Sequence, residues 1–277
     1  MYNSRMSNKE VYEANLHIRF EELRNGSDQA YKLHELVFME AFVFATELHR
    51  DKLPQRILDV GCGLGFMTCS LINLGQEAVG IDPSETAIEL AKKEHSLDSF
   101  FASSAEHFSE IMVEHGIEVF DQAIINMVFH SVSDRSVLSI LKGVRKCIKP
   151  EGTILILVPD EEWLMYKLID YAQDQEMERS DGIAWVRKML NQKKVRIPVR
   201  INSGKYYPEQ LTIYNRSLED YAKLLRVCNF GVRWESYDEK TKEKIGSQIL
   251  PYLDMEDYVA NIKLMQHNRH LLMSFAL

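Results

Sequence analysis

A glycine-rich segment between a buried strand and a helix is the feature that most constrains the fold of this chain. The segment Asp59-Val60-Gly61-Cys62-Gly63-Leu64-Gly65 begins within the predicted strand 57–60. It leads into a helix that we predict through about Leu74. Glycines permit a tight turn and let a ligand approach the backbone closely. A strand, a glycine turn and a helix in this order predict the start of a βαβ unit with a ligand site at the turn.

The alternation of short apolar runs with amphipathic segments continues as far as residue 158. The predicted strands are 57–60, 78–81, 99–102, 120–127 and 153–158, and further helices are predicted at 84–95 and 136–148. Such apolar runs are typical of parallel strands covered on both faces. We therefore predict an α/β fold with a doubly wound, mostly parallel seven-stranded sheet, and we expect its last strand at 270–276.

Residues 1–50 predict a helical lid in front of this sheet. Ser7 and Glu10 have the spacing of a capping box, which marks the start of a helix running to about residue 24. A second helix at about 28–48 has a wide apolar stripe, so it is expected to be buried on more than one side. That stripe could be covered by the sheet or by a second subunit, so a homodimer is one of the two expectations.

A cap is predicted within the remaining domain, 51–277. After residue 159 the alternation of strands and helices stops, and the stretch 161–192 has a helical pattern. The run 195–201 then alternates apolar and polar residues, with a candidate partner strand at 211–214. This pattern indicates a hairpin. We therefore predict a helical and β cap inserted at about 160–215.

Composition excludes several classes of function. The chain of 277 residues has 41 acidic and 33 basic residues, a net charge of −8, which would repel a phosphate backbone, so no nucleic acid is expected. The four cysteines lie far apart, and neither they nor the histidines and acids have metal-ligand spacing. The polar start and the lack of a long apolar run predict no signal peptide and no membrane span. Reduced thiols favour a cytoplasmic protein.

The details of the glycine loop distinguish between cofactors. In a nicotinamide dinucleotide fingerprint the third glycine would stand at Phe66, whereas here it comes one position earlier, at Gly65. Asp59 would oppose a pyrophosphate but would help to hold a cationic methionine group. Asp82, at the end of the next predicted strand, suits a carboxylate that accepts two ribose hydroxyls. The pair of acids favours S-adenosylmethionine (SAM) over NAD.

The same residues resemble a known family. The segment 57–82 resembles motif I and the following acidic position of class I, Rossmann-like SAM-dependent methyltransferases. The segment 120–132 looks like the family's fourth strand, and 141–152 like the helix and turn before the fifth strand. Segment 217–231 is similar to a later helix of small-molecule members. The resemblance implies transfer of a methyl group from SAM to a small-molecule acceptor through an O, N or C nucleophile.

The resemblance also implies roles for individual residues. The residues that it assigns to the cofactor are Asp59, Gly61, Cys62, Gly63, Gly65, Asp82, Pro83, Ser104, Ala105, Glu106, Asn126 and Met127. The loop and Asp59 would surround the methionine moiety, Asp82 would hold the ribose, and 104–106 would flank the adenine. Ser104 departs from the aspartate that is frequent in the family. Asn126 would offer its backbone carbonyl to the methionine amine.

Residues that would meet the acceptor are predicted after the fourth strand, in the lid and in the cap. His130 is the candidate general base, with a structural histidine as the alternative. Tyr12 and Tyr31 lie on the lid helices, and Asp160 and Trp163 begin the cap. The two tyrosines could touch the cofactor or the substrate, or serve packing alone. Asp160 and Trp163 could contact the substrate, or serve helix capping and packing alone.

Other functions are compatible with the same cofactor loop. A macromolecular methyltransferase acting on RNA or protein would require a basic face or an open groove, and the negative net charge disfavours the RNA substrate. A non-catalytic SAM-binding partner subunit would keep the loop and both acids without turnover. A nicotinamide oxidoreductase would bind NAD instead of SAM.

Overall fold

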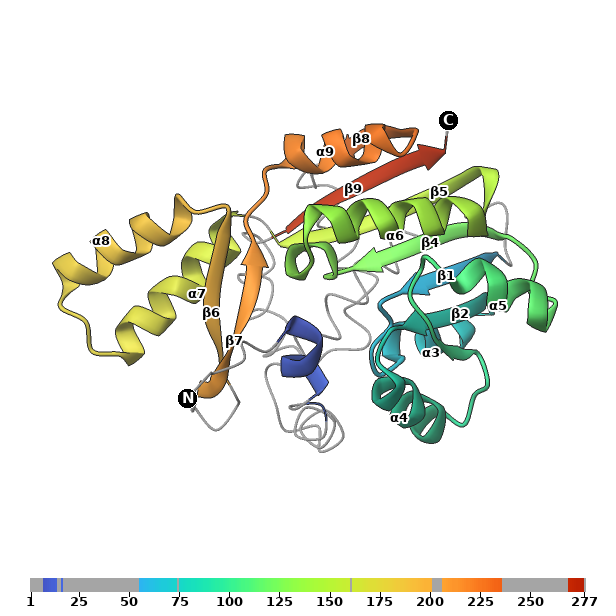
Figure 1. Ribbon diagram of the computed structural model, residues 1–277, viewed down its shortest axis with the longest axis horizontal. Coiled ribbons are helices and arrows are strands. Elements are labelled where there is room, and N and C mark those ends of the chain that lie inside the picture. Colours follow the sequence, from blue (N-terminus) through green and yellow to red (C-terminus); the bar gives the residue numbers. More distant parts are fainter. Residues whose placement is uncertain are drawn as a thin grey trace, which may run out of the picture.

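A computed structural model describes residues 7–13, 16, 55–73, 75–159, 161–200, 206–235 and 269–276. Its centre is a sheet in the order β3-β2-β1-β4-β5-β9-β8 (Figure 1). The five parallel strands are β1 (Arg56–Val60), β2 (Glu77–Asp82), β3 (Phe100–Ala102), β4 (Phe120–Asn126) and β5 (Ile148–Pro159). Two antiparallel strands, β9 (Arg269–Ala276) and β8 (Phe230–Glu235), extend the sheet beyond β5. The predicted α/β class is confirmed.

The order of the strands reverses between β1 and β4, and this reversal creates the position of the site. The sheet helices are α3 (Phe66–Asn73), α4 (Glu85–His95), α5 (Phe108–His115), α6 (Asp134–Cys147) and α9 (Leu218–Val227). Because parallel crossovers are right-handed, α3 and α4 cover one face while α5 and α6 cover the other. Phe108, Leu141 and Leu225 accordingly share one apolar core with Ala123 and Ile125 of β4. Ligands of open α/β sheets bind at such a switch point, outside the carboxyl ends of the strands.

The cap consists of a helical pair and a hairpin. Helices α7 (Glu161–Asp174) and α8 (Arg179–Leu190) precede strands β6 (Lys194–Arg200) and β7 (Tyr206–Tyr214). The predicted hairpin is present, with Val195 opposite Ile213. Both residues pack with Leu168 and Val186 in an apolar cluster separate from that of the sheet. The stretch predicted as continuously helical breaks at Glu176, which takes a left-handed conformation with φ 51°.

The structure differs from the predicted elements at one strand boundary and in two elements that were not predicted. Strand β5 begins at Ile148, five residues before the predicted start, because Ile148 pairs with Phe120 of β4. Helix α5 and strand β8 were not predicted. The predicted second lid helix at 28–48 and the later part of the first lie outside the described residues.

The start of the first lid helix is described and has its predicted cap. Residues 8–13 are helical. The Ser7 backbone N–H donates to Glu10 Oε2 at 2.6 Å, and the Glu10 N–H donates to Ser7 Oγ at 3.3 Å. This reciprocal pair satisfies two of the amide donors that every helix start leaves open.

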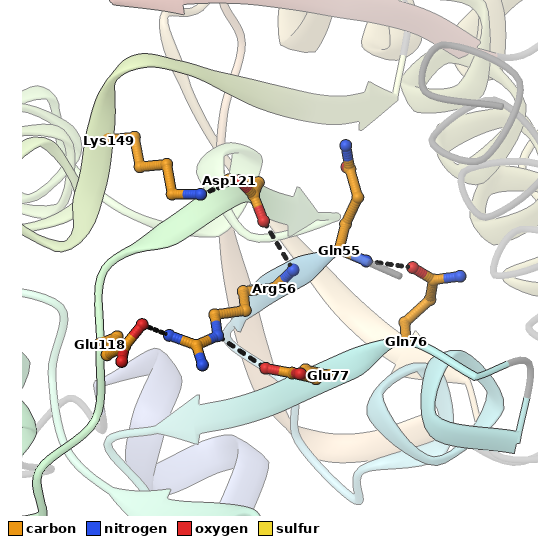
Figure 2. A network of polar contacts seen from close by, with 7 residues as sticks. All are labelled: Gln55, Arg56, Gln76, Glu77, Glu118, Asp121 and Lys149. Carbon is orange, nitrogen blue, oxygen red and sulfur yellow. Dashed lines mark hydrogen bonds and ion pairs between the residues drawn. The ribbon is translucent and has the colours of Figure 1, made fainter. Parts of the chain in front are cut away.

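A polar network ties the strands together at their amino-terminal ends, opposite the glycine loop (Figure 2). The Arg56 guanidinium contacts Glu77 and Glu118, while Asp121 accepts from the Arg56 N–H at 2.9 Å and from Lys149 Nζ at 2.5 Å. Partial burial opposes ionisation of Asp121, but these two donors hold its pKa below the ordinary value. The Lys149 contact joins the early start of β5 to β4.

Candidate functional site

The glycine loop takes a conformation that only glycine adopts easily. Gly61, Gly63 and Gly65 have φ of +76°, +53° and +79°. The N–H of Gly61 donates to the Ile81 carbonyl at 2.8 Å, which fixes the loop to the end of β2. A Cβ on Gly65 would stand 2.5 Å from the Phe100 ring. The loop therefore exposes backbone, and not side chains, at the carboxyl edge of the sheet.

Asp82 ends β2 beside this loop and has only 9% of its surface exposed. Its Oδ2 accepts from the Gly63 N–H at 3.1 Å, and its Oδ1 accepts from the Ser84 N–H at 2.8 Å. Burial raises the pKa of Asp82, and these two amide donors oppose that effect. Each carboxylate oxygen has further lone pairs, so the group suits a ligand with two neighbouring hydroxyls.

Asp59 lies deeper, at 2% exposure, on β1 directly before the loop. Thr68 Oγ1 donates to Asp59 Oδ2 at 2.7 Å. The pKa of Asp59 is raised to about 7, chiefly by burial and in part by the charge of Asp82, against the opposing effect of the Thr68 hydrogen bond. Two buried carboxyl groups around one glycine loop favour a ligand with a positive charge.

We expect Asp59→Asn to flatten the dependence of stability on pH. The pKa of Asp59 is raised in the folded protein from the ordinary 3.8 to about 7. The folded state therefore holds this proton between those values, and the free energy of unfolding falls as pH rises through that window. The fall should be about 2–4 kcal/mol for this group. Urea unfolding of both proteins at pH 5 and pH 8 measures it.

Asp121→Asn is the matched control for that experiment, because the pKa of Asp121 is lowered. Its contribution to stability is lost only below the ordinary pKa of 3.8, so Asp121→Asn should lose as much stability between pH 5 and pH 8 as the wild type. An Asp59→Asn protein that loses as much stability between pH 5 and pH 8 as the wild type would contradict the assignment.

The residues predicted near an adenine follow β3. Ser104, Ala105 and Glu106 lie in a turn that starts where the Ser103 N–H donates to the Asp82 carbonyl at 3.0 Å. Ala105 is buried and Glu106 is exposed. Pro83 is exposed at the start of α4. The structure thus brings this turn and Asp82 together on neighbouring strands.

The thiol of Cys62 is buried beside β2. Its Sγ would lie 2.9 Å from a Cβ on Gly80, and the residue packs with Ile88 and Phe100. Burial raises the pKa of the Cys62 thiol well above its ordinary value, so it stays protonated. The thiol is a packing group, which limits the predicted cofactor role of Cys62 to its peptide.

The end of β4 meets the loop from the neighbouring strand. Met127 has φ 56°, a conformation that is uncommon for a residue other than glycine, and its N–H donates to the Leu157 carbonyl at 2.9 Å. Val128 Cγ2 stands 2.5 Å from the Cβ position of Gly61. The buried Asn126 Oδ1 has no hydrogen-bond partner. Strained backbone such as the positive φ of Met127 is concentrated at functional sites.

His130 lies on the short 3-10 helix η1 (Phe129–Ser131), which follows β4. Burial lowers the pKa of His130 to about 4, and the Arg216 guanidinium adds to this effect. The imidazole is therefore neutral at pH 7. A neutral imidazole can accept a proton, although this low pKa makes it a weak base.

The described start of the first predicted helix lies between the cap hairpin and α4 (Figure 1). The hydroxyl of Tyr12 stands 2.8 Å from the Cβ position of Gly63, and Leu16 packs with Leu64 and Ala87. Tyr12 was predicted to touch the cofactor or the substrate, and its hydroxyl lies at the loop predicted for the cofactor. Tyr12 and Leu16 thus place the start of this helix beside the loop.

Two side chains join these parts but were not predicted. The Asn8 amide donates to the Ser131 carbonyl at 2.5 Å and exchanges two 2.8 Å hydrogen bonds with the Thr212 backbone. Arg216 donates to the Phe129 and Val132 carbonyls. Their partners are distant in the sequence, so no local pattern marks either residue.

For the other substrate candidates, contact with a substrate stays a prediction. Tyr31 and Asp160 lie outside the described residues, and of Trp163 the structure describes only the backbone, in α7. Within the described part of the chain no group of three or more His, Cys, Asp or Glu side chains could hold a metal ion. No helix among those residues is long and apolar enough to cross a membrane.

The chain is similar in sequence to known methyltransferases. The family described as "Methyltransferase domain" matches residues 52–209. An uncharacterized methyltransferase of Staphylococcus carnosus is 30% identical over 154 residues, which cover 55% of this chain and 69% of that protein. The human mitochondrial ubiquinone biosynthesis O-methyltransferase is 33% identical over 119 residues, or 42% of this chain. That match spans only about a third, 32%, of the human protein.

A solved structure supports the fold over nearly the whole chain. The magnesium protoporphyrin IX methyltransferase of Synechocystis PCC 6803, with bound SAH, superposes with a TM-score of 0.57. The superposition covers 96% of this chain and 98% of that protein at 12% identity. At this identity the likeness concerns the fold alone.

Proposed function

Because the chain belongs to the methyltransferase domain family, we propose that it transfers a methyl group from SAM to a small-molecule acceptor. The observation that carries the proposal is the pair of buried carboxyl groups, Asp59 and Asp82, on either side of a backbone-exposing glycine loop. A cationic ligand with a ribose diol matches both the charge and the acceptor oxygens of this pair.

The described residues fit such a ligand in four respects. Asp82 offers acceptor oxygens to two ribose hydroxyls, and the glycine loop presents backbone without side chains beside that carboxylate. The turn 104–106 would flank the adenine. The Asn126 carbonyl would accept from the methionine amine, and the buried amide oxygen of Asn126 lacks a hydrogen-bond partner of its own.

SAM supplies an electrophilic sulfonium methyl when bound, so the protein must mainly align the acceptor and exclude water. Tyr12 and the first lid helix cover the loop, and Asn8 joins this lid to the cap hairpin. His130 would accept a proton from an acceptor that arrives protonated. Its low pKa suits an acceptor that ionises easily, so we propose that proton removal is a minor part of catalysis.

A small acceptor is proposed because lid and cap both adjoin the site. Curated relatives named ubiquinone biosynthesis O-methyltransferase make phenols the first class to test. A cytoplasmic location and a homodimer stay predictions. Macromolecular substrates and a purely SAM-binding subunit are the alternatives that the experiment must separate.

Calorimetric titration with SAM, SAH and NAD, followed by turnover with phenols, amines and carbon acids, tests the proposal. We expect micromolar binding of SAM and SAH, no binding of NAD, and SAH production with at least one small acceptor. Binding of SAM without product from any acceptor would favour a binding subunit. A folded protein that binds NAD but neither SAM nor SAH would refute the proposal.

A further inference from the structure

The guanidinium of Arg216 closes the turn that follows β4. Its side chain is only 5% exposed. Nη1 donates to the Phe129 carbonyl at 2.6 Å, Nη2 donates to the Val132 carbonyl at 2.7 Å, and Nε donates to Asp134 Oδ1 at 2.7 Å. One planar fork thus holds both ends of η1, and we call residues 127–132 the His130 turn.

The His130 turn depends on such outside donors. Helix η1 is three residues long and has no side-chain hydrogen bond at its N-cap, Val128. The carbonyls at the end of so short a helix have no partners within it. Met127, at the start of the turn, has a positive φ, and strained backbone persists only where the surroundings hold it. Arg216 supplies two of those holding contacts.

The turn transmits this hold to the candidate cofactor loop. Val128 packs on Gly61, where its Cγ2 lies 2.5 Å from the Cβ position. Asn8 of the lid donates to the Ser131 carbonyl of the same turn. Arg216 itself follows strand β7 of the cap and lies beyond the residues, 52–209, that match the family. The position is thus a feature of this chain's cap.

The surroundings of Arg216 are built for a buried fork. The guanidinium lies 5.0 Å from the ring centre of Tyr214 and 5.6 Å from that of Tyr221. The two aromatic faces and the Asp134 carboxylate stabilise the guanidinium charge of Arg216, which burial keeps from contact with water. A lysine has a single ammonium, so it cannot reach both carbonyls with the same geometry.

We propose that Arg216 is a positioning residue, whose guanidinium holds the His130 turn against the glycine loop and so shapes the methyl-donor side of the site. The inference rests on the proposed function for its link to SAM. The hold on the turn itself is a property of the ligand-free protein. Arg216 acts through the turn and touches neither reactant.

Arg216→Lys and Arg216→Met test the proposal, with Arg226→Met as matched control. Arg226 lies on α9 and makes one exposed pair with Glu219. In both Arg216 variants we expect hydrogen exchange of the amides at 127–132 to accelerate about tenfold, while β1 and β2 exchange as in the wild type. The NMR titration of His130 should move upward from about 4, because the nearby positive charge is displaced or lost.

A role confined to overall stability would accelerate exchange in β1 and β2 as much as at 127–132, which would overturn the proposal. Affinity for SAH should fall about fivefold in both Arg216 variants and not in Arg226→Met. Unchanged SAH affinity with a loosened turn would overturn the link to the site. If wild-type protein binds no SAH, the proposed function fails, whereas the exchange data still decide whether Arg216 holds the turn.

Discussion

Asp82→Ala is expected to weaken binding of SAM and of SAH by about a hundredfold or more. The substitution removes both acceptor oxygens that we assign to the ribose, and hydrogen bonds to an ionised carboxylate each contribute about 1.5–3 kcal/mol. It also leaves the Gly63 and Ser84 amides without their present acceptor, so the loop loses one of its contacts with the end of β2. Titration calorimetry of the folded variant measures the effect.

Two variants separate loss of the site from loss of the fold. Glu77→Ala removes a carboxylate from the opposite end of the same strand, where it pairs with Arg56, and should bind SAH as the wild type does. Asp82→Asn keeps one acceptor oxygen and should bind with intermediate affinity. If Asp82→Ala binds SAH as tightly as Glu77→Ala, Asp82 does not hold the cofactor.

The parts of the fold that the sequence predicts correctly are those whose determinants lie within a few residues. The glycine loop requires a positive φ at Gly61, Gly63 and Gly65, and three alternating glycines in the sequence predict such a conformation. The capping box at Ser7 needs only Glu10, and both are visible in the sequence. Local chemistry of this kind can be predicted without knowing what lies opposite in the fold.

The parts that the sequence does not reveal depend on contacts between distant segments. Strand β5 starts early because Ile148 pairs with Phe120 of β4 and Lys149 forms an ion pair with Asp121 of the same strand. Asn8 reads as an ordinary polar residue near a helix start, yet it binds the backbone of Thr212. Tertiary pairing decides such positions.

The site shows the same division. Asp59 and Asp82 could be assigned from their places relative to the loop, since parallel strands bring their carboxyl ends to one edge. The pKa of Asp59 is raised to about 7 because the carboxyl group is buried. Composition and residue spacing do not predict that burial. Arg216 was not predicted, because its acceptors are backbone carbonyls near β4 and carry no sequence signal.

A glycine in the middle of α6 leads to the second large effect that we expect. Gly143→Ala should lower the free energy of unfolding by about 2–3 kcal/mol. A Cβ at this position would stand 2.0 Å from the Ala105 carbonyl oxygen and 2.3 Å from its carbonyl carbon. Both are backbone atoms, which cannot turn aside as a side chain can. Helix propensity alone would favour alanine by about 1 kcal/mol, so the direction of the effect is informative.

Gly182→Ala, in α8, is the matched control. Its Cβ would meet only the side chains of Ala172 and Met177, both at 3.7 Å, an ordinary contact distance. Freed from any clash, this substitution should be neutral or stabilising by up to about 1 kcal/mol. Urea unfolding of the two variants and the wild type, compared at equal m-value, measures the difference.

Gly143→Ala should also weaken SAH binding, because the clash falls on the turn that we assign to the adenine. Relief of the clash requires α6 or the turn at Ala105 to move, and β3 ends three residues before Ala105. The glycine is thus the place where the helix layer on one face of the sheet sets the position of a cofactor-binding turn. A Gly143→Ala protein as stable as Gly182→Ala would mean that α6 does not approach that turn. A destabilised protein with unchanged SAH affinity would instead remove the turn from the site.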